Sequence, residues 1–318
     1  MKTIPDSGAS VTCGRRGWAV LAVGLALVAG GRVPPVEARV VFQKYSPYHH
    51  VMVLEQGGLR ILSFDGTQET RMSLRNPLQG HFEYTEFFHF GWLWNTNLNR
   101  VLMLGLGGGS AQRSFLHHYP AVTLDSVEID PVVVQVASNY FHVAASERHR
   151  IRVDDGRTFV RRSQDTYDLI VLDAYTKHRY GSQIPQHLAT REFFELAQRR
   201  LTTNGVLAYN VITTGRLGGA DAGLALARTL QSVFPQVYVF RANTSLNAVL
   251  IATKDSQRWT NADLSRRATE LIRGGLTPPA GLFQRLPSFH LDVPREVERA
   301  PLLTDDYAPV ESLGRRRR

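Results

Sequence analysis

The sequence predicts an α/β protein with a doubly wound, mostly parallel, Rossmann-like sheet and a small β-domain in front of it. Apolar runs at 101–104 and 167–172, and a further predicted strand at 122–127, alternate with helical segments. Strands that are apolar on both faces and alternate with helices form parallel sheets. Two further runs, 237–241 and 248–253, are separated by a stretch too short for a parallel crossover. The sheet is therefore expected to end in an antiparallel hairpin.

The composition is that of an ordinary globular chain with enough apolar residues for a sizeable core. Of 318 residues, 43% are hydrophobic and 20% are charged, which excludes disordered, collagen-like and coiled-coil chains. The one cysteine, Cys13, excludes a disulfide framework and a cysteine-rich zinc site. The net charge of +9 includes four arginines at 315–318, which we interpret as a solvated tail, and no nucleic-acid partner is expected.

The N-terminus has the features of a targeting segment. Lys2, Arg15 and Arg16 precede an apolar run at 18–29, and small residues follow. The run is shorter than the about 20 residues that cross a membrane, so the pattern predicts a signal peptide, residues 1–38, that is cleaved. An uncleaved membrane anchor is the alternative, and only this segment would then contact a membrane. In both cases the domain is expected outside the cytoplasm, either exported (periplasmic or secreted) or membrane-anchored.

Residues 39–97 are predicted to form the small β-domain and a linking helix. Two apolar runs flank Gln56-Gly57-Gly58, a hairpin signal, and Asp65-Gly66 marks a second turn. A helical stretch at 84–94 leads into residues 98–318, the Rossmann-like domain with its basic C-terminal tail.

The large domain alternates strands and helices in the order of class I methyltransferase-type sheets, which end in an antiparallel hairpin. Between the apolar runs we expect a helix through His118, helices at 131–140, 191–201 and 221–234, and strands at 151–153 and 206–210.

Four of the predicted parallel strands end in residues suited to a ligand, which binds at the carboxyl ends of such strands. Glu128, about 20 residues beyond the first strand end, can accept hydrogen bonds from both hydroxyls of a ribose. Asp155, which precedes Gly156, could bond an adenine amino group or cap the next helix. Asp173 ends the fourth strand, where a base or a cation-binding group belongs. The first strand is followed by a glycine loop that allows close backbone approach: Gly105, Gly107, Gly108 and Gly109.

In combination these strand ends predict an adenosyl ligand, and S-adenosylmethionine fits them better than NAD. No lysine follows the glycines, so a P-loop is excluded. No metal is expected, because His49 and His50 are adjacent on a strand and therefore point to opposite faces. No strand-to-helix nucleophile elbow supports a Ser-His-Asp hydrolase.

Across residues 41–255 the chain resembles the spermidine synthase family of aminopropyltransferases. The closest resemblance is to its spermidine synthase-like group, some members of which are fused to membrane transporter segments. The matching motifs are Tyr45-Ser-Pro-Tyr-His, Glu83-Tyr84-Thr-Glu86, the glycine loop, Val127-Glu128-Ile-Asp130, Asp155-Gly156, Asp173-Ala-Tyr175, Ile184-Pro-Gln-His187-Leu, Thr190-Arg-Glu-Phe and, near the C-terminus, Leu303-Thr-Asp305-Asp306-Tyr-Ala-Pro-Val-Glu.

The resemblance implies an enzyme that moves the aminopropyl group of decarboxylated S-adenosylmethionine to a polyamine or another small amine. It also implies a protein that can pair into a homodimer. Asp173 would accept a proton from the attacking amine, Glu128 would bind the ribose and Asp155 the adenine. The remaining residues matched to the substrate site are Tyr84, which would line the amine pocket, Glu86, which would supply negative charge, Tyr175 and His49.

The chain also departs from the family pattern. The loop aspartate of the synthases is replaced by Gly108, a second aspartate by Thr176, and a glutamine by His49. Lys177, His178 and Arg179 follow Thr176. Each lost charged hydrogen bond to a diamine would cost about 1.5–3 kcal/mol.

These departures leave two alternatives open. Without the loop aspartate, the carboxylate of intact S-adenosylmethionine is no longer repelled, so a methyltransferase on the same fold is the first. The second is an exported nucleoside- or polyamine-binding protein without catalysis, because the predicted leader would export the chain whereas adenosyl donors are made in the cytoplasm.

Overall fold

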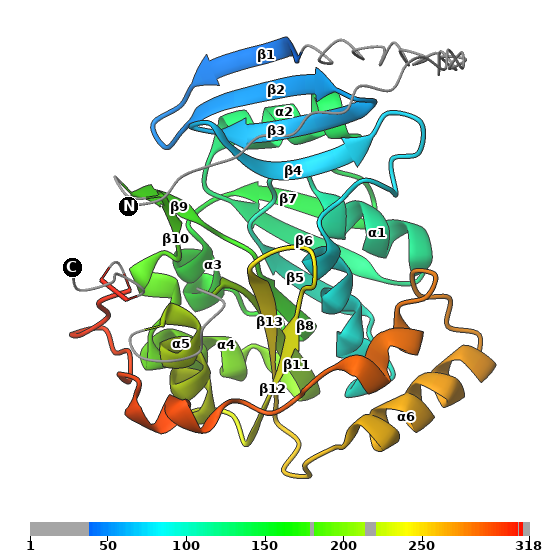
Figure 1. The fold of residues 1–318 in the computed structure, drawn as a ribbon, viewed down its shortest axis with the longest axis vertical. Helices are drawn as coiled ribbons and strands as arrows, with labels where there is room; N and C mark the ends of the chain where they lie inside the picture. The colour runs from blue at the N-terminus through cyan, green and yellow to red at the C-terminus, as the bar shows by residue number, and fades with distance from the viewer. Residues whose placement is uncertain (1–37, 179–180, 214–220, 311, 314–318) are drawn as a thin grey trace, which may run out of the picture. The chain divides into compact units, whose positions relative to one another are not determined.

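The computed structural model describes residues 38–178, 181–213, 221–310 and 312–313. The predicted signal peptide up to residue 37, Arg179 and the arginine tail lie outside these ranges. Two sheets and a short two-stranded hairpin make up the strands of the described chain (Figure 1). Within the same ranges, no helix is both long enough and apolar enough to span a membrane.

The N-terminal sheet is a four-stranded antiparallel meander in the order β1-β2-β3-β4. Gly57 and Gly58 adopt positive φ at the predicted hairpin, as tight hairpin turns require. Val51, Val53, Leu62 and other apolar residues of this sheet share a core cluster with α2 (Pro131–Phe141). The strands are β1 (Arg39–Tyr45), β2 (His50–Gln56), β3 (Leu59–Phe64) and β4 (Thr67–Ser73).

The large sheet has seven strands in the order β12-β13-β11-β8-β5-β6-β7. The pairs of β5, β6, β7, β8 and β11 are parallel, whereas β13 pairs antiparallel with both β11 and β12. The predicted closing hairpin is therefore confirmed. The strands are β5 (Arg100–Leu104), β6 (Thr123–Glu128), β7 (His149–Val153), β8 (Tyr167–Leu172), β11 (Leu201–Ile212), β12 (Gln236–Arg241) and β13 (Asn247–Thr253).

Helices cover both faces of this sheet (Figure 1). Apolar residues of α3, α4 and α5 form one core cluster with it, and those of η1, α1 and α6 form another. The doubly wound arrangement is thus as predicted. The helices are α1 (Ser110–His118), α3 (Gly156–Arg162), α4 (Arg191–Arg199), α5 (Ala222–Gln231) and α6 (Asn261–Arg273), with 3₁₀ segments η1 (Glu83–Leu93), η2 (Gln186–Leu188), η3 (Phe283–Ser288) and η4 (Arg295–Arg299).

Three elements differ from the expectations in detail. The linking helix expected at 84–94 is the 3₁₀ segment η1, whose residues from Phe87 onward are buried on every side rather than along one stripe. Strand β11 is longer than the expected 206–210, with a register shift against β8 between Leu201 and Val206. A short hairpin, β9 (Thr176–His178) with β10 (Gly181–Gln183), was not expected.

Candidate active site

Asp173 lies at the carboxyl end of β8, directly beside the glycine loop that follows β5. Its backbone N–H donates to the carbonyl of Leu104 at 2.9 Å. Gly105 has φ of +101°, and a Cβ placed there would lie only 2.2 Å from the carbonyl oxygen of Asp173. The loop can pass this close to Asp173 only because residue 105 has no side chain.

Two side chains from distant elements donate hydrogen bonds to the carboxylate of Asp173. Asn210 of β11 donates through Nδ2 at 2.8 Å, and the Tyr84 hydroxyl of η1 donates at 3.2 Å. Burial raises the pKa of Asp173 to about 6, although both hydrogen bonds act in the opposite direction. A carboxyl group with this pKa is ionised at pH 7 and is still basic enough to accept a proton from a bound substrate.

Tyr84 remains a hydrogen-bond donor at neutral pH. Burial, and next the charge of Asp173, raise the pKa of Tyr84 well above its ordinary value. Asn210 is held in turn by Asn247 of β13, whose Nδ2 donates to Asn210 Oδ1 at 3.0 Å. This arrangement aims the Asn210 amide N–H at Asp173. The Tyr175 hydroxyl donates to the backbone carbonyl of Asn210 at 3.0 Å, so Tyr175 belongs to the same group.

Glu128 connects the glycine loop to the start of α2. One of its carboxylate oxygens accepts the backbone N–H of Leu106 at 3.0 Å, and the other accepts that of Asp130 at 3.0 Å. Burial nevertheless raises the pKa of Glu128. Gly107 adds a further backbone hydrogen bond, and since a carboxylate has about four acceptor positions, capacity for a ligand hydroxyl remains.

Asp155 caps the N-terminus of α3, the helix that Gly156 opens. Its Oδ1 accepts the Thr158 backbone N–H at 2.8 Å, and its Oδ2 lies 2.7 Å from His187 Nε2. Burial opposes ionisation of Asp155, but the hydrogen bonds from Thr158 and the neighbouring His187 outweigh it and lower the pKa. The helix-cap interpretation of Asp155 is therefore confirmed, and the adenine contact stays a prediction.

The glycine loop also touches the N-terminal sheet. The backbone N–H of Gly108 donates to Thr70 Oγ1 of β4 at 2.9 Å. A Cβ at position 108 would lie 2.6 Å from Thr70 Cγ2 and 2.9 Å from Thr70 Cβ. Thr70 therefore occupies the space into which a side chain at position 108 would extend.

Comparison with known proteins agrees with this geometry. The model of the spermine/spermidine synthase domain matches residues 81–245, which include the glycine loop and Asp173. The chain belongs to the spermine/spermidine synthase family. The polyamine aminopropyltransferase of Vibrio vulnificus is 31% identical over 286 residues, 87% of this chain and 92% of that relative.

Two solved structures share the fold. The first is human methyltransferase-like protein 13 in complex with SAH, 26% identical, with a TM-score of 0.53 over 60% of this chain and 91% of that chain. The second is a probable spermidine synthase from Corynebacterium glutamicum, 20% identical, with a TM-score of 0.61 over 81% of this chain and 98% of that chain. Both likenesses agree with the mostly parallel sheet.

Two residues matched to the substrate site of the family lie in other networks. Glu86 pairs with Arg285 at 2.5 Å and with His81 at 2.9 Å. His49 Nδ1 lies 3.1 Å from Asp65, and its ring stacks on Phe64. The structure gives neither side chain a contact with Asp173 within the described ranges, so their roles in amine binding stay predictions.

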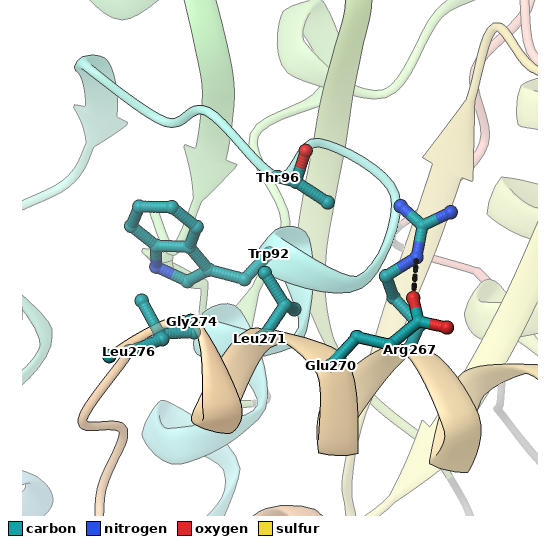
Figure 2. A pocket seen from close by; sticks show the side chains of 8 residues that line it. Trp92, Thr96, Arg267, Glu270, Leu271, Gly274 and Leu276 are labelled. Carbon is teal, nitrogen blue, oxygen red and sulfur yellow. Dashed lines mark ion pairs between the residues drawn. The ribbon is translucent and has the colours of Figure 1, made fainter.

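A separate hollow lies beside α6, away from these residues. Figure 2 shows Trp92, Thr96 and Leu271 around it, together with the ion pair between Arg267 and Glu270 at 3.4 Å. None of the predicted site residues lines this hollow. No cluster of three or more histidine, cysteine or acidic side chains in the described part of the chain is arranged to hold a metal.

Sequence reasoning did not identify Asn210, Thr70 or the loop contact that Thr70 makes. Asn210 follows the apolar run 206–209 of β11, so the rule that pointed to Asp173 could also have pointed to Asn210. Thr70 carries no comparable signal, because its contact depends on how β4 lies against the glycine loop.

Proposed function

We propose that this chain transfers the aminopropyl group of decarboxylated S-adenosylmethionine to a polyamine or related amine, with Asp173 as the base. The observation that carries the proposal is the Asp173 carboxylate at the end of β8, with its pKa raised to about 6 and its two oxygens held by Tyr84 and Asn210. The family of the chain is that of spermine and spermidine synthases.

The chemistry requires a base at this point. An amine is mostly an ammonium ion at neutral pH, and an ammonium nitrogen has no lone pair with which to attack carbon. Asp173 takes the proton, and the freed lone pair attacks the aminopropyl carbon bonded to the sulfonium. The carbon–sulfur bond breaks, its electrons go to sulfur, and methylthioadenosine leaves as a neutral thioether. Tyr84 and Asn210 orient the carboxylate through their hydrogen bonds.

The nucleoside part of the donor fits the residues around the glycine loop. Glu128 keeps acceptor capacity beside the loop, where a ribose would place its two hydroxyls. Asp155 stands at the end of the next strand and can accept from an adenine amino group through a remaining lone pair. The glycines allow the ligand to approach the backbone of the loop closely.

Methyl transfer is the second candidate, and one observation favours it. Position 108 carries no acidic side chain, and Thr70 fills the space that such a side chain would need. The loop itself therefore does not repel the carboxylate of intact S-adenosylmethionine.

Calorimetric binding of the two donors to the protein lacking residues 1–38 separates these functions. Tighter binding of decarboxylated S-adenosylmethionine, with release of methylthioadenosine on addition of a diamine, is the expected result. Tighter binding of the intact donor would indicate methyl transfer. Binding of neither donor would contradict both enzymatic functions.

The role of Asp173 has its own test. Asp173→Asn should lower kcat by about 100-fold or more, because the amide cannot accept the proton. Affinity for methylthioadenosine should not change, since the product lacks the transferred group. In the unchanged enzyme, kcat/KM should rise with pH through about 6 as Asp173 ionises. Undiminished turnover of the Asn variant would remove Asp173 from the mechanism.

A further inference from the structure

The proposed donor carries a positive charge at the end of the group that is transferred. Decarboxylated S-adenosylmethionine ends in an ammonium. In the intact donor, the carbon that bears this ammonium also bears a carboxylate. An enzyme that selects the decarboxylated donor therefore needs an anionic side chain near the glycine loop. Asp173 has to accept a proton from the amine, and the loop has no room for an acid at position 108.

The adjacent strand β4 contains an irregularity that places an acid there. In the pairing of β3 with β4, Leu62 lies opposite Thr70, but the next residue, Ser63, lies opposite Gln68. Glu69 is therefore the extra residue of a β-bulge. Bulges redirect side chains away from the regular alternation and are frequent next to active sites.

Contacts of its neighbour along the strand place Glu69 beside the glycine loop. Thr70 accepts the backbone N–H of Gly108 at 2.9 Å. Glu69 is one peptide unit from this contact and is partly buried, so its backbone lies beside the point where the loop meets the N-terminal sheet.

The same strand also reaches the aromatic segment that leads to Tyr84. The Arg71 guanidinium lies 4.4 Å from the centre of the Phe82 ring, and the Phe82 ring stacks with that of Tyr84 at 6.3 Å. The charge of Glu69 contributes, after burial and the charge of Asp173, to raising the pKa of both Tyr84 and Tyr175. Both phenols belong to the group around Asp173, so the charge of Glu69 is close enough to act on that group.

We propose that Glu69 binds the terminal ammonium of the aminopropyl group and repels the carboxylate of intact S-adenosylmethionine. Glu69 thus determines donor specificity. It supplies the negative charge that the loop lacks, because position 108 is a glycine. The inference rests on the proposed aminopropyl transfer, since only a decarboxylated donor offers this ammonium without a carboxylate beside it.

The test measures the affinity of decarboxylated S-adenosylmethionine, intact S-adenosylmethionine and methylthioadenosine for two proteins. These are the protein lacking residues 1–38 and its Glu69→Gln variant, which keeps the size of the side chain and removes its charge. Affinity for decarboxylated S-adenosylmethionine should fall about 10- to 100-fold, as expected for one charged hydrogen bond. Affinity for intact S-adenosylmethionine should stay equal or rise. Methylthioadenosine, which has no aminopropyl group, should bind both proteins equally and so reports an intact site.

The outcomes separate this inference from the proposed function. Equal loss of affinity for all three ligands, or no loss for the decarboxylated donor, would overturn the role of Glu69. If the unchanged protein itself prefers intact S-adenosylmethionine, the proposed function fails first. Glu55→Gln on β2 is the matched control, because it removes the same charge from the same sheet at a residue that pairs with Arg39 and Arg60.

A rescue experiment makes the test stricter. In the Glu69→Gln background, Thr70→Gly with Gly108→Asp would open the occupied space and place a carboxylate on the loop. We expect this triple variant to regain at least part of the preference for the decarboxylated donor. Normal methylthioadenosine binding without any regained preference would argue that a carboxylate in this region does not select the donor.

Discussion

The buried carboxyl group of Asp173, the proposed base, lowers the stability of the protein at neutral pH. Burial raises its pKa from 3.8 to about 6, so the native state binds more protons than the unfolded state between these values. The free energy of unfolding therefore falls as pH rises from about 4 to 6, and the loss persists at pH 7. Because Asp173 is partly exposed at the strand end, we place this loss at about 2 kcal/mol.

Replacement of Asp173 by Asn should therefore stabilise the protein while abolishing turnover. An amide can accept from Asn210 and donate to the Tyr84 hydroxyl, so both hydrogen bonds can be kept. We expect a higher melting temperature for the variant at pH 7.5 and little advantage at pH 3.5, where the carboxyl is mostly protonated in both states. Thermal melts across this pH range measure the difference. A gain of the same size at both pH values would show that charge burial is not its cause.

Only the site residues that directly follow a predicted parallel strand could be predicted from the sequence. Glu128, Asp155 and Asp173 each follow a strand that the sequence predicts, and the carboxyl ends of parallel strands meet at one edge of the sheet. Tyr84 was matched only through the resemblance to a family, because nothing local in η1 brings it to Asp173. Glu69 could not be predicted, since a β-bulge depends on pairing with β3 that the sequence does not reveal.

The glycine loop and the end of β8 act as one structural element. Gly105 is both in the left-handed region, at φ +101°, and in contact with the backbone of Asp173. Gly105→Ala should therefore cost more than the backbone strain of about 1 kcal/mol, because the methyl group collides with a carbonyl that cannot move alone. Gly275→Ala is the control, since Gly275 has φ of +97° and no atom within 4 Å of a Cβ.

Denaturant unfolding and methylthioadenosine binding would measure both variants. We expect Gly275→Ala to lose about 1 kcal/mol of unfolding free energy and no affinity. Gly105→Ala should lose more stability and also nucleoside affinity, since the loop must move away from Asp173. Equal behaviour of the two variants would show that the contact between loop and Asp173 is not tight.

Helices and strands could be predicted from the sequence where the pattern of apolar residues determines the type of element. The parallel strands and the antiparallel pair β12–β13 follow from apolar runs and from the length of the connection. Segment η1 was expected as an ordinary helix, because its aromatic side chains pack on every side and no polar face marks the tighter 3₁₀ geometry. The short hairpin β9–β10 carries no alternating apolar pattern, which is why the sequence does not reveal it.

At the scale of the whole molecule, the C-terminal segment closes the fold. Leu303 is fully buried in the core cluster that contains α4 and α5, and its carbonyl accepts the backbone N–H of Arg191 at 2.9 Å. Asp305 binds the Arg157 guanidinium through two bonds of 2.6 and 2.5 Å and accepts the Thr190 hydroxyl at 2.7 Å. The segment thereby joins α3 to the N-cap of α4.

Loss of this carboxylate should be measurable in the stability of the entire chain. Asp305→Ala removes a bidentate ion pair that is partly exposed, so we expect a decrease of about 1 kcal/mol in unfolding free energy. Asp306→Ala is the adjacent control at an exposed residue and should change stability by less than about 0.5 kcal/mol. Urea unfolding of both variants measures the two changes. Similar midpoints would show that the ion pair between Asp305 and Arg157 contributes nothing to stability.

The predicted signal peptide makes a further prediction at this scale, because the cut must spare the N-terminal sheet. Arg39 is the first residue of β1, lies opposite Glu55 of β2 and pairs with it at 2.5 Å. A cut after residue 38 therefore leaves every strand of that sheet intact, whereas a cut after residue 45 would remove β1. We expect the exported protein to begin at Arg39 and to melt at the same temperature as the full chain. N-terminal sequencing of protein from the periplasm or the medium, followed by thermal melts, measures both. Protein found only in the cytoplasm with its first residue at Met1 would contradict export and remove the objection to ordinary polyamine synthesis there.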